Sequence, residues 1–356
     1  MVHARRIPSL DGLRGIAAIT VMEFHFNHFY LPQARLSDIL PCLERAYLAV
    51  DLFFLLSGFV MAHVYGRGLA SNWRQHWLNF AVARFARLLL VMIIIAFVSD
   101  TPLPVLSSAR ALVLQPLMLQ QWASGWNYPS WSISTEAEAY VYFVFLAGLL
   151  FTRRNPLLIA SSCIFILIGL SVRNGGNLNC FGGTCALLRT LAEFSLGVVL
   201  YRVSLSNARL LHCRWAATSA VLLAGLAMVT DWDLLMVGAF GCLIHYCVKA
   251  PEARAGRLLN SRPAVALGNW SYSIYLWHVP THYSVMAMLA AIGYPVRNLS
   301  MLSARMLIFA TTLVVISLSA ASYRYFETPV RRFILTRIVP PRRYGERDRA
   351  SAIARS

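Results

Sequence analysis

The sequence predicts an all-α integral membrane protein, a bundle of about ten transmembrane helices with both termini in the cytoplasm. Hydrophobic residues make up 58% of the 356 residues and charged residues only 13%, whereas soluble domains carry about a quarter charged residues. Apolar runs long enough to span a bilayer recur along the chain. Most of the 32 Lys and Arg residues fall in every second connection between these runs, which is the positive-inside pattern of cytoplasmic loops.

The expected spans follow from the length of each apolar run, since a spanning helix needs roughly 17–25 mostly apolar residues. In chain order they are 15–31, 46–65, 80–98, 133–151, 156–172, 186–203, 215–231, 234–249, 270–292 and 302–323. The run 107–122 is short and contains Pro116, so we expect an interfacial or re-entrant helix there. Residues 1–335 then form one transmembrane domain, and residues 336–356 form a basic cytoplasmic tail that we expect to be disordered.

Composition and motifs exclude several classes of function. The net charge of +17 does not indicate a nucleic-acid-binding protein, because the cations lie in short loops and form no soluble basic domain. No Cys/His spacing typical of a metal site occurs, and we expect no metal cofactor. No Gly-x-Ser-x-Gly motif of a serine hydrolase is present. Cys180 and Cys185 lie in one loop, either as a disulfide, if that loop faces an oxidising compartment, or as a reduced pair.

The first span carries ionisable groups that are costly to bury in a membrane and are therefore candidate functional residues. Arg14 and His25 are 11 residues apart, which places them within about 20° of one helix face and about 16 Å apart along the axis. A cation at the cytoplasmic edge can hold a phosphate, and a neutral imidazole at depth can take a proton from a hydroxyl. A donor with a phosphate head and a long thin arm, such as a coenzyme A thioester, fits between them. The alternative is a positive-inside anchor together with a packed polar histidine.

Six short motifs are spread over nearly the whole chain. In chain order they are SLDGLRGIAAITVMEFHF, VDLFFLLSGF, RFAR, WSISTEAEAYVYF, LGNWSYSIYLWH and YFETPVRR. These motifs, in this order, match the signature motifs of the membrane acyltransferase 3 family. The chain therefore resembles that family. Two positions depart from the family pattern: Leu88 stands where a proline often follows the Arg-x-x-Arg motif, and Glu23 occupies a position that is usually apolar.

This resemblance implies a multi-pass enzyme of the bacterial inner membrane that moves an acyl group, often acetyl, from cytoplasmic acyl-CoA to a sugar hydroxyl. By motif, His25 is expected to be the general base, and Glu136 is expected to take part in catalysis. Acyl-CoA is expected to bind to Arg14, Arg84 and Arg87, and the last two share one helix face. The residues expected to contact the substrate are Asp51, Trp131, Ser132 and His278. The expected partners are therefore acyl-CoA, a sugar or glycan acceptor and the lipid bilayer, with no nucleic acid.

Several of these residues also have a purely structural interpretation. Asp51 either pairs with an arginine or sits at an aqueous edge, and Glu136 either serves the site or neutralises a buried arginine. His278 either faces the cavity or makes a structural contact. The aromatic segment WASGWNYPSWS is either an interfacial belt, which we favour, or a floor for a sugar ring.

Two other functions suit a chain of this composition. The first is a transporter of a sugar-containing or small-molecule substrate, since buried charges suit that function as well. The second is a non-catalytic membrane scaffold. A transporter would need no acyl-CoA, and a scaffold would keep its function without His25.

Overall fold

The computed structural model describes residues 6–73, 77, 80–82, 118–122, 127–152, 155–205, 213–294 and 296–338. Within these ranges the secondary structure is helical, with no β-strand. Arg84, Arg87, most of the expected span 80–98, most of the run 107–122 and nearly all of the basic tail lie outside the described residues.

Each expected span that falls on described residues coincides with a helix. The helices and the π-helical turns that continue three of them are α1 (Pro8–His25) with η1 (Phe26–Tyr30), α2 (Ala49–Met61) with η5 (Ala62–Gly66), α5 (Trp131–Thr152), α6 (Pro156–Arg173), α7 (Gly183–Leu205), α8 (Cys213–Thr230), α9 (Asp233–Lys249), α10 (Arg254–Leu259), α11 (Arg262–Ala291), α12 (Met301–Ser322) with η9 (Tyr323–Glu327), and α13 (Thr328–Ile338).

Two helices begin earlier than hydropathy predicts, because their polar first turns are held by the protein. α1 starts at Pro8, and Arg6 donates a hydrogen bond to Asp11 at 2.6 Å. α11 starts at Arg262 instead of near residue 270. Its polar segment packs against α1, so it avoids lipid, and a hydropathy window cannot register that packing.

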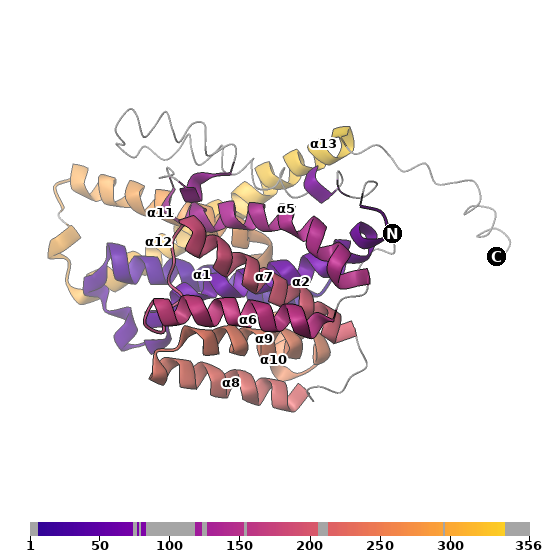
Figure 1. Cartoon of the computed structure of the whole chain (residues 1–356). Helices are drawn as coiled ribbons and strands as arrows, with labels where there is room; N and C mark the ends of the chain where they lie inside the picture. Colours follow the sequence, from indigo (N-terminus) through magenta and orange to yellow (C-terminus); the bar gives the residue numbers. More distant parts are fainter. Residues whose placement is uncertain are drawn as a thin grey trace.

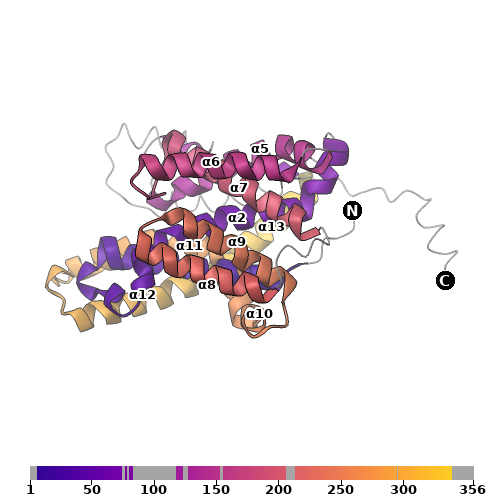
Figure 2. The same cartoon turned by 60° about the horizontal axis from the view of Figure 1, so that its bottom comes forward.

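Glycines allow the central helices to approach closely, as is common where helices pack within a membrane. α1 and α2 lie in the middle of the bundle, as Figures 1 and 2 show, with α11 packed on α1 and α7 packed on α2. A Cβ added to Gly15 would meet the backbone of Gly268 on α11, and one added to Gly58 would meet the backbone of Phe194 on α7. These two contacts set the positions of the side chains that line the site.

Five helical segments among the described residues are long and apolar enough to cross a membrane. They are Pro41–Trp73, Tyr128–Phe151, Pro156–Arg173, Gly183–Ser204 and Met301–Phe333. The chain is thus a helical membrane protein, and the full number of spans remains a prediction.

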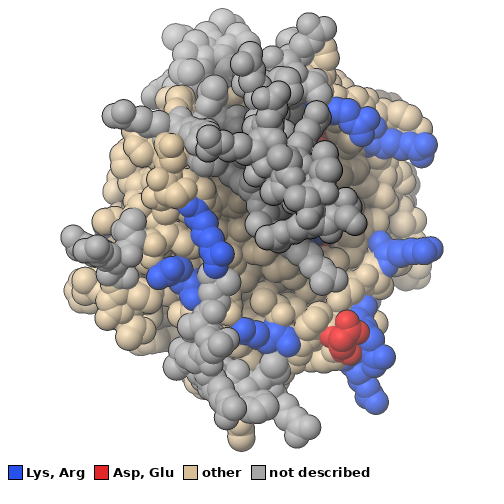
Figure 3. Space-filling model, turned by 90° about the vertical axis from the view of Figure 1, so that its right-hand side faces the viewer, with Lys and Arg blue, Asp and Glu red and all other residues tan. Residues whose placement is uncertain are grey.

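One end of the bundle is basic. The first turns of α1 and α11 lie at this end, near both chain termini (Figure 1). Exposed cations here include Arg67 after α2, Lys249 at the end of α9, Arg257 on α10 and Arg262 at the start of α11. Figure 3 views this end and shows Lys and Arg side chains around its rim with few acidic ones.

Candidate active site

Two buried histidines meet between α1 and α11. His25 is the last residue of α1 and is 8% exposed, and His278 on α11 is fully buried. His278 Nε2 lies 3.2 Å from His25 Nδ1, and the ring centroids are 5.0 Å apart. The sequence predicted both histidines as site residues but gave no reason to place them in contact.

The hydrogen bonds of this pair define which nitrogens carry protons. His278 Nδ1 lies 3.3 Å from the carbonyl oxygen of Ile274, which can only accept a hydrogen bond. A neutral His278 therefore carries its proton on Nδ1 and accepts at Nε2. His25 must then donate from Nδ1, which leaves the lone pair of His25 Nε2 available to take a proton.

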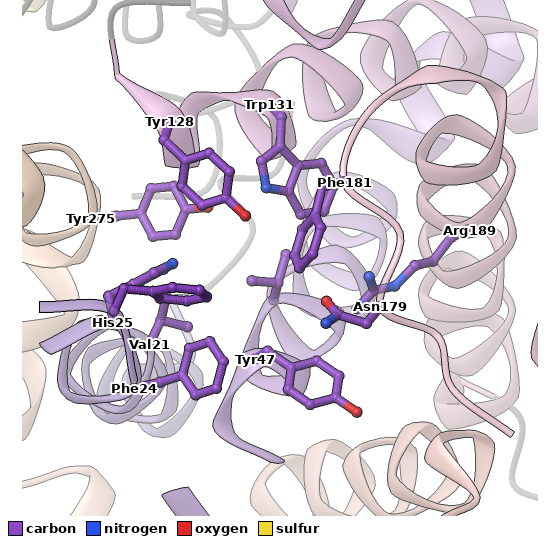
Figure 4. Close-up of a pocket in the computed structure, with 12 residues that line it drawn as sticks. Val21, Phe24, His25, Tyr47, Tyr128, Trp131, Asn179, Phe181, Arg189 and Tyr275 are labelled. Carbon is purple, nitrogen blue, oxygen red and sulfur yellow. The ribbon is translucent and has the colours of Figure 1, made fainter. Parts of the chain in front are cut away.

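His25, at the end of α1 that lies away from the basic end, lines a pocket. The walls come from the end of α1, the start of α2, the start of α5 and the loop before α7 (Figure 4). We call this the outer pocket. Its lining residues are Val21, Phe24, His25, Phe29, Tyr47, Val50, Tyr128, Trp131, Asn179, Phe181, Arg189 and Tyr275. Most of the lining is aromatic, with a few polar groups, which is the usual composition of a small-molecule site.

Arg14 lines a second pocket, which we call the inner pocket. Its lining residues are Arg14, Val50, Phe53, Phe54, Ser132, Ile133, Glu136, Ser271, Tyr272 and Tyr275. Val50 and Tyr275 belong to both pockets, so the two spaces share a wall. The Tyr275 hydroxyl lies 2.7 Å from Ser132 Oγ and donates to the Pro129 carbonyl at 2.8 Å.

Glu136 lines the inner pocket and is held there by hydrogen bonds. Its Oε1 accepts a hydrogen bond from Ser57 at 2.6 Å and another from Tyr140 at 2.7 Å. Arg14 lines the same pocket. The role of Glu136 in catalysis stays a prediction.

Asp51 lies in a buried ionic triad with Arg189 and Glu193. Arg189 donates to both carboxylate oxygens of Asp51, at 2.6 and 2.5 Å, and lies 3.6 Å from Glu193. All three side chains are at most 1% exposed. This is the pairing with an arginine that the sequence left open for Asp51, and a contact between Asp51 and substrate stays a prediction.

Sequence reasoning missed several residues of the site. Arg189 gave a usable signal, because a cation within an apolar run followed by an acid four residues later indicates a buried charged group. Tyr275 was not among the predicted site residues, and Asn179 and Phe181 lie in a loop without a recognisable motif. Cys180 and Cys185, which flank Phe181, form a disulfide. Among the described residues no cluster of three His, Cys, Asp or Glu side chains could hold a metal ion.

A family model described as an acyltransferase domain matches residues 7–323. The chain belongs to this acyltransferase family. The resemblance read from the six motifs is therefore confirmed.

Named relatives match along most of the chain. The acyltransferase MdmB of Streptomyces mycarofaciens is 28% identical, over 92% of this chain and 92% of its own length. YrhL of Bacillus subtilis is 23% identical over 92% of this chain, and the O-acetyltransferase OatA of Staphylococcus aureus is 23% identical over 93%. The chain spans only 55% of YrhL and 58% of OatA. No solved structure matches this chain.

Proposed function

We propose that this chain is a multi-pass O-acyltransferase of the bacterial inner membrane that moves an acyl group, acetyl in the simplest case, from acyl-CoA to a sugar hydroxyl. The proposal rests on one arrangement: a pocket with Arg14 and a pocket with His25 share the wall formed by Val50 and Tyr275. A donor held at one side and an acceptor held at the other would meet at this wall. The names of MdmB and OatA agree with the reaction class.

The donor would enter from the basic end of the bundle, which the positive-inside rule places in the cytoplasm. Arg14, with Arg84 and Arg87, would hold the phosphates of coenzyme A, since a guanidinium binds phosphate with two hydrogen bonds. The thioester arm would then run through the inner pocket past Ser132 and Glu136. Its carbonyl would reach the shared wall beside Tyr275.

His25 would act as the general base from Nε2, the nitrogen that its bond to His278 leaves without a proton. It would take the proton of the acceptor hydroxyl as the hydroxyl oxygen attacks the thioester carbonyl carbon. The carbon–sulfur bond then breaks, and His25 passes the proton that it took from the hydroxyl to the coenzyme A thiolate. His278 is a positioning residue in this scheme, because it holds the His25 ring without touching the reacting atoms.

The test is acyl transfer by purified protein in lipid nanodiscs, followed as thiol release from acetyl-CoA. We expect His25→Ala to lower the rate by about 10²–10⁴-fold, the usual contribution of a general base. His28→Ala is the matched control, because His28 lies three residues later and bonds to Glu44 at 3.1 Å, outside both pockets. Equal rates for wild type and a folded His25→Ala variant would exclude this role, and a wild type without thiol release would favour the transporter.

A further inference from the structure

We propose that the outer pocket binds one pyranose ring of the acceptor, and that the loop before α7 selects the sugar through Asn179 and Phe181. This inference rests on the proposed function, because it names the substrate class of the same site. It adds two selecting residues that lie outside all six family motifs.

Aromatic rings form the mouth of the outer pocket. The Phe181 ring lies 6.1 Å from Tyr128 and 6.0 Å from Trp131, measured between ring centroids. Phe181 is 48% exposed and Tyr128 is 47% exposed, so the rings border an opening. In Figure 4 both rings turn toward the centre of the pocket, as a sugar-binding floor requires and a lipid-facing belt does not. The negative face of an aromatic ring suits the weakly positive C–H face of a pyranose.

Asn179 supplies an unused polar group within this aromatic pocket. Its Oδ1 atom is buried and has no hydrogen-bond partner. Figure 4 shows the amide directed into the pocket. A buried acceptor without a partner is unfavourable, and a sugar hydroxyl that donates to Oδ1 would satisfy it. A site built in this way discriminates between sugars by the position of their hydroxyls.

The loop that carries Asn179 and Phe181 is fixed on both sides. The disulfide between Cys180 and Cys185 ties it to α7. On the other side, the Leu178 amide donates to Asp233 at 2.7 Å. Asp233 also accepts from Tyr47, at 2.8 Å. The two selecting side chains are therefore held in place before the acceptor arrives, which lowers the entropy cost of binding.

The pocket brings a bound ring within reach of the base. The ring centroids of His25 and Tyr128 are 6.2 Å apart, and His25 is itself a lining residue. A pyranose lying on the exposed faces of Phe181 and Tyr128, at the mouth of the outer pocket, would therefore present a hydroxyl toward His25. No ion pair has to break, since Arg189 at the rear wall keeps both bonds to Asp51.

The test measures sugar binding directly and without a donor. Saturation-transfer NMR would record the binding of the methyl pyranosides of glucose, galactose, mannose, rhamnose and N-acetylglucosamine to the protein in nanodiscs. We expect wild type to bind at least one of these sugars, and Phe181→Ala and Asn179→Ala to weaken that binding about tenfold or more, as expected for the loss of a hydrogen bond or an aromatic contact. Phe165→Ala, on α6 with a 77% exposed ring outside the pocket, is the control and should bind like wild type.

Coenzyme A binding, measured on the same samples, separates the two proposals. Variants that lose sugar binding but keep coenzyme A binding support the acceptor pocket. If wild type binds coenzyme A but none of the pyranosides, or if both variants bind the sugar as wild type does, the acceptor pocket is wrong while the acyltransferase proposal stands. If sugar binding depends on Asn179 and Phe181 but the protein does not bind coenzyme A, the acceptor-pocket proposal stands and the acyltransferase proposal is wrong.

Discussion

At the scale of single residues, the proposed chemistry depends on the contact between His25 and His278. The Ile274 carbonyl fixes the proton of His278 on Nδ1, and this in turn fixes the proton of His25 on Nδ1. In the proposed mechanism, the His25 Nε2 lone pair would take the proton of the acceptor hydroxyl without any rearrangement. A partner that orients a histidine in this way commonly changes activity by about 10–100-fold when it is removed.

Substitutions of His278 separate positioning from packing. We expect His278→Leu to lower kcat by about 10–100-fold with little change in KM for acetyl-CoA, because the inner pocket does not include His278. His278→Gln should recover much of the activity, since its side-chain oxygen can accept the hydrogen bond from His25 Nδ1. Steady-state kinetics on folded variants would check this. Equal losses for the Gln and Leu variants would mean that the ring only fills space.

Sequence reasoning at this scale could place residues of periodic segments on a common helix face. Arg14 and His25 were predicted as a pair because helical geometry places them on one face, and each lines a pocket. The link between His25 and His278 could not be predicted, because it depends on how α1 crosses α11. Asn179 and Phe181 were missed for a similar reason, since a disulfide and Asp233 position their loop from distant parts of the chain.

At the scale of elements, the triad of Asp51, Arg189 and Glu193 joins α2 to α7. Two carboxylates share one guanidinium, and all three groups are buried. Removing one partner of a buried ion pair commonly destabilises a protein by about 3–5 kcal/mol, because the remaining charge is left uncompensated. The triad therefore stabilises the same helix pair that Gly58 and Gly197 bring close together.

We expect substitutions in this triad to lower the stability of the protein by different amounts. Arg189→Met leaves two buried carboxylates without a cation and should lower the free energy of unfolding by about 3–5 kcal/mol. Asp51→Ala should cost less, because Glu193 can still pair with Arg189. Asp38→Ala is the control, since its pair with Arg35 is more than half exposed and such pairs contribute about 0–1 kcal/mol. SDS-induced unfolding in mixed micelles would rank the free energies of unfolding of these variants. An Asp51→Ala variant with wild-type stability but a raised KM would show instead that Asp51 binds substrate.

Helix positions were predicted well because hydropathy and helix length determine them. α1 and α11 begin earlier than predicted, because a hydropathy window does not distinguish polar residues that pack against protein from loop residues. Membrane crossing by all ten expected segments stays a prediction, because length and composition support it for five segments of the described chain.

At the scale of the whole molecule, the two ends of the bundle differ in chemistry. The end with the chain termini is basic (Figure 3), and the outer pocket at the opposite end is mostly aromatic (Figure 4). A phosphorylated donor suits the first end and a sugar suits the second. The reaction would then take place between them, where His25 and the inner pocket approach the shared wall at Tyr275.

The separation of donor binding from chemistry is the most direct test of this arrangement. Coenzyme A binding and thiol release from acetyl-CoA would be measured in nanodiscs for wild type, His25→Ala and the double variant Arg14→Ala with Arg84→Ala. We predict that His25→Ala binds coenzyme A like wild type but releases no thiol above background. The double variant should bind about tenfold or more weakly, because each lost charged hydrogen bond is worth about 1.5–3 kcal/mol. Tight coenzyme A binding by the folded double variant, or undiminished thiol release by His25→Ala, would contradict the account.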